Sequence, residues 1–251
     1  MSAAAVLEVQ QLQKVFGGIK ALDGIDLKVF EGQILGLIGP NGAGKTALLN
    51  TITGFYRANG GSIRLKGQEI SHLPLYEIGR LGIGRTFQNI RLFKRMSVLE
   101  NVLVANKAHA ARPLFSLLDR QWRRRGREQA LALLDMFQLA DKANSSAASL
   151  SYGDSRRLEI ARALAGNPDL LLLDEPAAGM NDAETEQLVE DITRVRQSVR
   201  AMVLIEHDMS LIRNLSDHIV AMDYGRKIAE GNAQTVLEHP DVRRAYLGDD
   251  A

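Results

Sequence analysis

Eight consecutive residues carry the clearest chemistry in this sequence. They match the pattern G-x-x-x-x-G-K-[ST] at every specified position, and they are Gly39, Pro40, Asn41, Gly42, Ala43, Gly44, Lys45 and Thr46. In such a loop the glycines let backbone N–H groups turn toward an anion, the lysine supplies a charge for the β- and γ-phosphates, and the final hydroxyl can bind Mg²⁺. The pattern therefore predicts a nucleotide-binding loop. A chance match is the alternative, and the strand and helix expected on either side disfavour it.

A second group of chemically capable residues follows an apolar run at 170–173. Asp174 and Glu175 come at the end of this expected strand. Carboxylates at the carboxyl end of a buried strand fit a magnesium site: Asp174 would hold the ion, directly or through water, and Glu175 could orient or deprotonate an attacking water. An acidic surface turn is the alternative, but a complete phosphate loop in the same chain favours the catalytic interpretation.

A third motif, at residues 150–154, begins an expected helix that Gly166 and Pro168 would end. Ser151 followed three residues later by Asp154 is a capping-box arrangement, at a helix end that carries partial positive charge. This pattern predicts a second anion site. A well-capped helix without a ligand is the alternative, but it leaves the neighbouring Tyr152 and Gly153 unexplained.

The elements that must position these motifs divide the chain into three parts. The first part has expected strands at 6–15, 26–29, 33–38 and 62–65, with a helix at 47–52. Apolar residues at helical spacing predict helices at 98–110 and 126–139 in the middle part. The last part alternates strands and helices, with strands at 170–173, 202–205 and 219–222, helices at 182–197 and from 209, a turn at 224–225, and a tail ending near 247. Such alternation predicts a parallel sheet with helices on its faces.

Composition narrows the possible classes of function. The chain has 251 residues with 45% hydrophobic content, which is enough for one large domain. Its net charge of +1 favours neither nucleic acid nor an acidic partner. The absence of cysteine excludes disulfides, thiolate metal sites and a cysteine nucleophile. No long apolar run or secretory signal is found, so we expect a cytoplasmic chain whose membrane role would come through a partner.

The order of the motifs resembles that of the ATP-binding subunits of ABC transporters. Residues 39–46 resemble Walker A, Gln88 the Q-loop, residues 150–154 the signature motif, residues 170–175 Walker B, and His207 the switch histidine. Finer details resemble the ATPases of branched-chain amino acid importers, of the LivG type. The segments concerned are 14–22, 85–93, 174–181, 205–209 and 224–231, together with the long stretch at 104–139.

This resemblance implies a fold and a division of the chain. The expected fold is α/β, a P-loop NTPase with a mostly parallel core sheet, an antiparallel β edge subdomain and an inserted α-helical subdomain. The whole chain, 1–251, would form one ATP-binding domain, with the helical subdomain and its signature motif at about 88–165 and a C-terminal tail at about 225–251. ATP and Mg²⁺ are the implied cofactors.

The resemblance also implies roles for single residues. Glu175, His207 and Gln88 would be catalytic, and the implied metal-binding residues are Thr46, Gln88 and Asp174. Two such subunits would face each other head to tail, so that Ser151 and Gly153 of one contact the γ-phosphate bound by the other. Phe16 would stack on adenine, although a place in the strand core is nearly as good an explanation.

The implied function is ATP hydrolysis that powers uptake of branched-chain or related amino acids. The implied partners are transmembrane permease subunits, a second ATPase of the same or a different kind and, indirectly, a periplasmic or extracellular solute-binding protein. The implied location of this chain is the cytoplasmic face of the inner membrane. The alternatives are an ATPase of lipid or lipopolysaccharide export, or a soluble ABC ATPase in DNA repair or translation. The second class usually has long coiled coils or a second ATPase module, which this chain lacks, so nucleic acid is not an expected partner.

Some features depart from the pattern or add to it. Asp154 stands where the family usually has glutamine, and we expect its charge to weaken the ATP-bound pair. Asn181 stands where most ABC ATPases have aspartate, which agrees with the branched-chain group. A basic cluster surrounds Trp122 and consists of Arg120, Arg123, Arg124, Arg125 and Arg127. A solvated helix face is the favoured interpretation of this cluster, and phospholipid contact is the alternative.

Overall fold

The computed structural model describes residues 4–106 and 120–247, except the side chains of Arg120, Trp122, Arg123 and Leu247. Within these residues a six-stranded sheet has the order β10-β9-β3-β8-β7-β6. Its strands are β3 (Ile34–Ile38), β6 (Ile83–Arg85), β7 (Leu170–Asp174), β8 (Ala201–Ile205), β9 (His218–Asp223) and β10 (Arg226–Gly231). Neighbours are parallel except β9 and β10. The mostly parallel core sheet is therefore confirmed.

The core strands of this sheet are apolar along their whole length. Every residue of β3, β7 and β8 is buried, as expected for parallel strands that are covered on both faces. Alternate side chains of each strand enter two separate hydrophobic clusters: on β7, Leu171 and Leu173 enter one and Leu170 and Leu172 the other. The two faces of the sheet thus carry two distinct parts of the core.

A second, antiparallel sheet has the order β2-β1-β4-β5 within the described residues. Its strands are β1 (Ala5–Phe16), β2 (Ile19–Phe30), β4 (Gly60–Leu65) and β5 (Gln68–Glu69). The turn between β1 and β2 needs positive φ at Gly17 and Gly18, which glycine adopts without strain. This sheet is the expected antiparallel edge, and it packs with α1 against one face of the core sheet.

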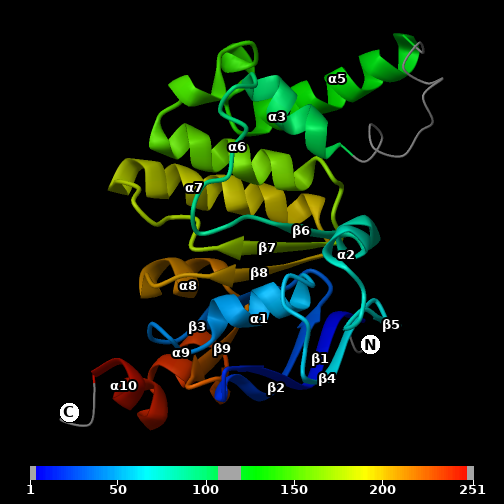
Figure 1. The fold of residues 1–251 in the computed structure, drawn as a ribbon. Helices are drawn as coiled ribbons and strands as arrows, with labels where there is room; N and C mark the ends of the chain where they lie inside the picture. Colours follow the sequence, from blue (N-terminus) through cyan, green and yellow to red (C-terminus); the bar gives the residue numbers. More distant parts are fainter. Residues whose placement is uncertain (1–3, 107–119, 248–251) are drawn as a thin grey trace.

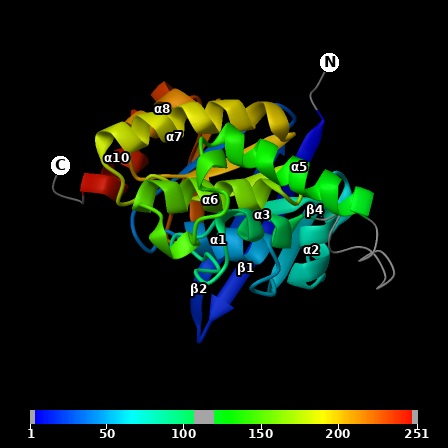
Figure 2. The same ribbon diagram turned by 90° about the horizontal axis from the view of Figure 1, so that it is seen from above.

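Helices cover the sheets, and three of them gather at one end of the molecule (Figure 1). They are α1 (Lys45–Ile52), α2 (Leu75–Leu81), α3 (Val98–Ala105), α5 (Arg120–Met136), α6 (Tyr152–Leu164), α7 (Asp182–Val195), α8 (Met209–Leu215), α9 (Ala233–Leu237) and α10 (Pro240–Leu247). Helices α3, α5 and α6 follow β6 and precede β7 in the chain, and Figure 1 shows them at the end opposite β1 and β2. In the view from above, these helices therefore lie in front (Figure 2). None of the described helices is long and apolar enough to cross a membrane.

Several element boundaries differ from those expected. Strand β2 begins at Ile19 rather than residue 26, because its first half is a partly exposed hairpin strand without an apolar alternation. Helix α5 begins at Arg120 rather than 126, since its first turns are basic and carry no apolar period. Helix α3 ends at Ala105, where Asn106 is extended, and the expected continuation at 107–110 lies outside the described residues.

Candidate functional site

The phosphate loop, residues 39–46, connects β3 to the first turn of α1. Its N–H groups therefore lie at a helix N-terminus, which favours an anion. Gly44 has φ +101°, and a Cβ atom there would lie 2.5 Å from the carbonyl oxygen of Ala21, so no larger residue fits. At the start of the loop, the Gly39 N–H donates to the hydroxyl of Tyr246 on α10 at 2.7 Å.

Lys45 is buried and folds back on its own loop. Its Nζ donates to the carbonyl oxygens of Gly39 at 2.5 Å and Pro40 at 3.0 Å. Burial lowers the pKa of Lys45, while the charges of Glu175 and Asp174 act in the opposite direction. The lysine, the loop and the two carboxylates that follow β7 therefore form one site.

Glu175 lies between the other two residues with expected catalytic roles. Its Oε2 accepts from Nε2 of Gln88 at 2.8 Å, and its Oε1 lies 2.6 Å from Nε2 of His207. The backbone at Glu175 has φ +49°, an uncommon conformation for a residue other than glycine, and such strain is often found at functional sites. The sequence predicts these three residues as one group, and in the structure they are in contact.

One carboxylate oxygen of Asp174, Oδ1, is free to bind a metal ion. Its Oδ2 accepts from Nη2 of Arg85 at 2.9 Å, while its Oδ1 is buried without a hydrogen-bond partner. Burial raises the pKa of Asp174, and the bond and charge of Arg85 oppose that effect. A buried unpaired carboxylate oxygen beside the phosphate loop fits a hard cation such as Mg²⁺. Of the other two expected metal-binding residues, Thr46 is exposed in the second position of α1, and Gln88 contacts Glu175.

Two charged residues near this site are absent from the sequence-based prediction of site residues. Arg85 joins α1 to β7, because its Nη1 donates to Oδ1 of Asn50 at 2.7 Å and its Nη2 to Asp174. Glu206 is buried, and its carboxylate accepts from the N–H groups of Ala177 at 2.7 Å and His207 at 3.2 Å. Burial raises the pKa of Glu206. In the sequence, each is a charged residue at or directly after the end of an otherwise apolar strand, and this pattern could have identified both.

The signature residues occupy the N-terminus of α6. Ser151 is the N-cap residue, and its hydroxyl accepts from the N–H of Asp154 at 3.1 Å. Gly153 packs against Glu184 of α7, whose Oε1 would lie 2.6 Å from a Cβ atom at this position. Within residues 4–106 and 120–247, no hydrogen bond or ion pair connects Ser151 or Gly153 with the phosphate loop.

The carboxylate of Asp154 is neutralised within the chain. Its Oδ2 lies 2.6 Å from Nζ of Lys142, and its Oδ1 lies 2.6 Å from Nη2 of Arg157. Burial acts to raise the pKa of Asp154, but the hydrogen bond from Lys142 and the charge of Arg157 outweigh it, so the pKa is lowered. These two cations reduce the repulsion of ATP by which Asp154 would weaken the ATP-bound pair, and the effect of Asp154 on that pair stays a prediction.

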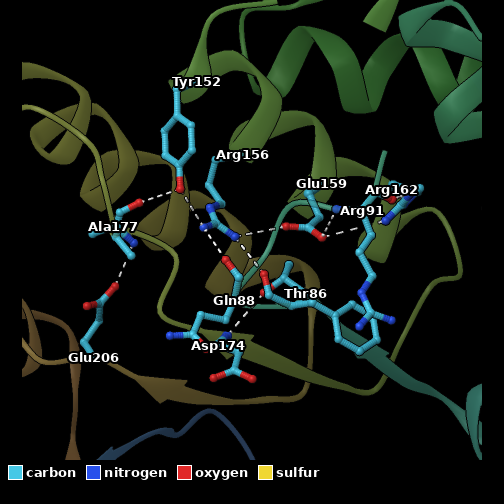
Figure 3. A network of polar contacts seen from close by, with 12 residues as sticks. Thr86, Gln88, Arg91, Tyr152, Arg156, Glu159, Arg162, Asp174, Ala177 and Glu206 are labelled. Carbon is cyan, nitrogen blue, oxygen red and sulfur yellow. Dashed lines mark hydrogen bonds and ion pairs between the residues drawn. The ribbon is translucent and has the colours of Figure 1, made fainter. Parts of the chain in front are cut away.

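A network of polar contacts joins α6 to the segment around Gln88 (Figure 3). Arg156 is completely buried, and its guanidinium donates to the carbonyl oxygens of Phe87 and Gln88, each at 2.8 Å. The hydroxyl of Tyr152 donates to the carbonyl oxygen of Ala178 at 2.7 Å and accepts from Arg156 at 3.1 Å. Helix α6 is thus bonded both to the segment that carries Gln88 and to the loop that follows Glu175.

Phe16 and the described side chains of the basic cluster lie at the surface. Phe16 is 40% exposed at the end of β1, with its ring edge-on to Tyr56 at 4.9 Å between centroids, so it is not a strand core residue. In the basic cluster, Arg124 pairs with Glu128 at 3.0 Å, and Arg125 is exposed. These contacts agree with a solvated helix face; the side chains of Arg120, Trp122 and Arg123 lie outside the description.

Comparisons with known proteins agree with this geometry. The model of the ABC transporter family matches residues 22–178, and the model described as branched-chain amino acid ATP-binding cassette transporter matches residues 226–251. The high-affinity branched-chain amino acid transport ATP-binding protein BraF of Pseudomonas aeruginosa is 46% identical, covering 97% of this chain and 98% of BraF. LivG of Escherichia coli K12, which has the same description, is 44% identical with the same coverage.

Solved structures give the same result for the fold. The ADP conformation of an ATP-binding cassette of an ABC transporter has a TM-score of 0.86 and 33% identity, covering 98% of this chain and 99% of that one. A nucleotide-free ATP-binding cassette from an ABC transporter matches with the same TM-score and identity. With near-complete coverage by relatives at this level of identity, this chain belongs to the ABC transporter family, as an ATPase related to the ATP-binding proteins of branched-chain amino acid transport.

Proposed function

We propose that this chain is the ATP-hydrolysing subunit of an importer for branched-chain or related amino acids. One observation carries the ATPase part: the Glu175 carboxylate is held by Gln88 and His207 beside the phosphate-loop lysine. The substrate class rests on the relatives BraF and LivG, whose names specify branched-chain amino acid transport.

In the proposed reaction, residues 39–46 bind the phosphates of ATP. Lys45 leaves the carbonyl oxygens that it contacts in this structure and interacts with the β- and γ-phosphates. Thr46, Asp174 and Gln88 are the proposed Mg²⁺ ligands, and the ion would neutralise phosphate charge when bound. Phe16, the exposed last residue of β1, would stack on the adenine.

Hydrolysis requires a water whose proton is removed as it attacks the γ-phosphate. Glu175 would accept that proton, and Gln88 would fix the direction of its carboxylate. Nε2 of His207, which contacts Glu175 in this structure, would then hydrogen-bond to the γ-phosphate instead. The water oxygen bonds to the γ-phosphorus as the bond between that phosphorus and the β,γ-bridging oxygen breaks, and ADP and phosphate leave.

A second ATPase subunit would complete the site. Ser151 and Gly153 have no bond to the phosphate loop of their own chain among the described residues, and they lie at a helix end that favours an anion. In a head-to-tail pair they would contact the γ-phosphate bound by the partner. The helical region at about 88–165 would then act as a subdomain that moves with the signature motif, and residues from about 225 would form the tail.

The proposed setting is the cytoplasmic face of the inner membrane. Transmembrane permease subunits would hold the ATPase there, and a periplasmic or extracellular solute-binding protein would deliver the substrate. Transport would follow from closure of the ATPase pair on ATP and its reopening after hydrolysis.

Uptake in the native organism tests the proposal. Deletion of the gene should abolish most high-affinity uptake of labelled leucine, isoleucine and valine, with lysine uptake as the internal control. The wild-type chain should restore uptake and the Glu175→Gln chain should not. Unchanged uptake of all three amino acids after deletion, with loss of another solute, would contradict the proposed substrate class.

A further inference from the structure

We propose that Tyr152 and Arg156 are positioning residues that transmit the position of α6 to Gln88 and to the loop after Glu175. This proposal rests on the ATPase function proposed above, and it assigns a task to Tyr152, which the motif chemistry leaves unexplained. The two side chains lie on successive turns of α6 and are hydrogen-bonded to each other at 3.1 Å.

Arg156 fixes the main chain of the Gln88 segment. Its Nη1 and Nη2 bond separately to the carbonyl oxygens of Phe87 and Gln88, so the planar guanidinium sets the direction of two consecutive peptide groups. Its side chain is 0% exposed, and Glu159 supplies a counter-charge at 3.2 Å. Since no water replaces these bonds at a fully buried site, the segment must move together with α6.

Helix α6 also bonds to the backbone of this segment at a third residue, Arg91. Glu159 accepts from the N–H of Arg91 at 3.2 Å, and Arg162 donates to the carbonyl oxygen of Arg91. Figure 3 shows these contacts beside those of Arg156. The backbone from Phe87 to Arg91 is therefore attached to α6 at both ends.

Tyr152 attaches the loop that follows Glu175 to the same helix, α6. Its hydroxyl donates to the carbonyl oxygen of Ala178, three residues after Glu175. Its ring lies against Gly179, where φ is +80° and a Cβ atom would lie 3.3 Å from the ring. The loop that begins with the catalytic carboxylate is thus bonded to the first turn of α6.

These attachments converge on one contact, the 2.8 Å bond between Gln88 and Glu175. Gln88 is held through Arg156, and the loop after Glu175 is held through Tyr152. The first turn of α6 also presents Ser151 and Gly153 to the partner subunit in the proposed pair. Contact with the partner's nucleotide would therefore align Gln88 and Glu175 in this subunit's own site.

The test compares Tyr152→Phe with wild type. This change removes only the hydroxyl and keeps the ring on Gly179. We expect kcat for ATP hydrolysis by the full chain to fall about three- to tenfold, the effect of losing the bond to Ala178, because Arg156 keeps its bonds to the two carbonyl oxygens when the hydroxyl is removed. ATP affinity should stay within twofold of wild type. Hydrogen exchange of the amides at 86–91 and 177–181 should become faster. Tyr76→Phe is the matched control, because it removes an exposed hydroxyl that bonds to Glu77 at 3.0 Å, and it should change none of these values.

A double-mutant cycle then separates a positioning role from a merely structural one. If Arg156 acts through Gln88, Arg156→Lys should lower kcat in the wild-type background but less than twofold in a Gln88→Ala background. Equal effects of Arg156→Lys in both backgrounds would overturn the coupling. Should Arg156→Lys fail to fold, the result for Tyr152→Phe decides.

The outcomes distinguish this proposal from the function beneath it. Wild-type hydrolysis together with unchanged kcat and exchange in Tyr152→Phe would remove the positioning role alone. A wild-type chain that neither binds nor hydrolyses ATP, alone or with its partner subunits, would remove the proposed function.

Discussion

Loss of Arg85 should strongly destabilise this protein. The pair of Arg85 and Asp174 is buried, with side chains 6% and 1% exposed and 2.9 Å between Nη2 and Oδ2. Because Oδ1 of Asp174 already lacks a partner, Arg85→Met would leave the whole carboxylate without a hydrogen bond from a side chain. Removing one partner of a buried ion pair typically lowers the free energy of unfolding by about 3–5 kcal/mol. We expect a loss in this range.

Arg64→Met provides the matched control. Arg64 pairs with Glu69 at 3.4 Å, but both side chains are more than 40% exposed, so its loss should cost less than about 1 kcal/mol. Urea unfolding at neutral pH, followed by circular dichroism, measures both variants. The combined variant with Asp174→Asn should be more stable than the sum of the single changes predicts, by about 1–3 kcal/mol. An Arg85→Met variant no less stable than Arg64→Met would refute the reasoning.

Two further predictions concern the signature helix and the phosphate loop. Asp154→Asn should lower the free energy of unfolding by about 1–2 kcal/mol at pH 7, discounted because Lys142 is partly exposed. Since the pKa of Asp154 is lowered by folding, this contribution is present above about pH 4 and is lost as the pH falls through the folded-state pKa. Urea midpoints of Asp154→Asn and wild type at several pH values measure it. A stability difference between the two that persists in acid would contradict it. Gly44→Ala should weaken binding of a fluorescent ATP analogue more than tenfold, because the new Cβ meets the Ala21 carbonyl oxygen; unchanged affinity would show that the loop relaxes freely.

The linear motifs and the layered fold could be predicted from the sequence because each depends on local information. A phosphate loop places its lysine and its glycines within eight residues, and an apolar strand that ends in Asp174 and Glu175 fixes both carboxylates at the sheet edge. The contact of Gln88 and His207 with Glu175 followed from the family resemblance, since these residues are far apart in the chain.

The partners of charged side chains could not be predicted in the same way. Arg85 reaches Asp174 because β6 pairs in parallel with β7, with Arg85 opposite Leu172, and this register is a long-range property. Asp154 is neutralised by Lys142, from a short helical turn outside the motif. The bond from Tyr152 to Ala178 likewise depends on how α6 packs over the loop after β7.

Single-turnover hydrolysis of ATP tests the central claim most directly. Wild-type and Glu175→Gln chains would be compared at equal ATP saturation, over a range of protein concentrations that favours pairing. The account predicts equal ATP affinity and hydrolysis that is slower by about 10²–10⁴-fold in Glu175→Gln, because the proton acceptor is lost. A Glu175→Gln chain that hydrolyses ATP as fast as the wild type would contradict the assignment of this site.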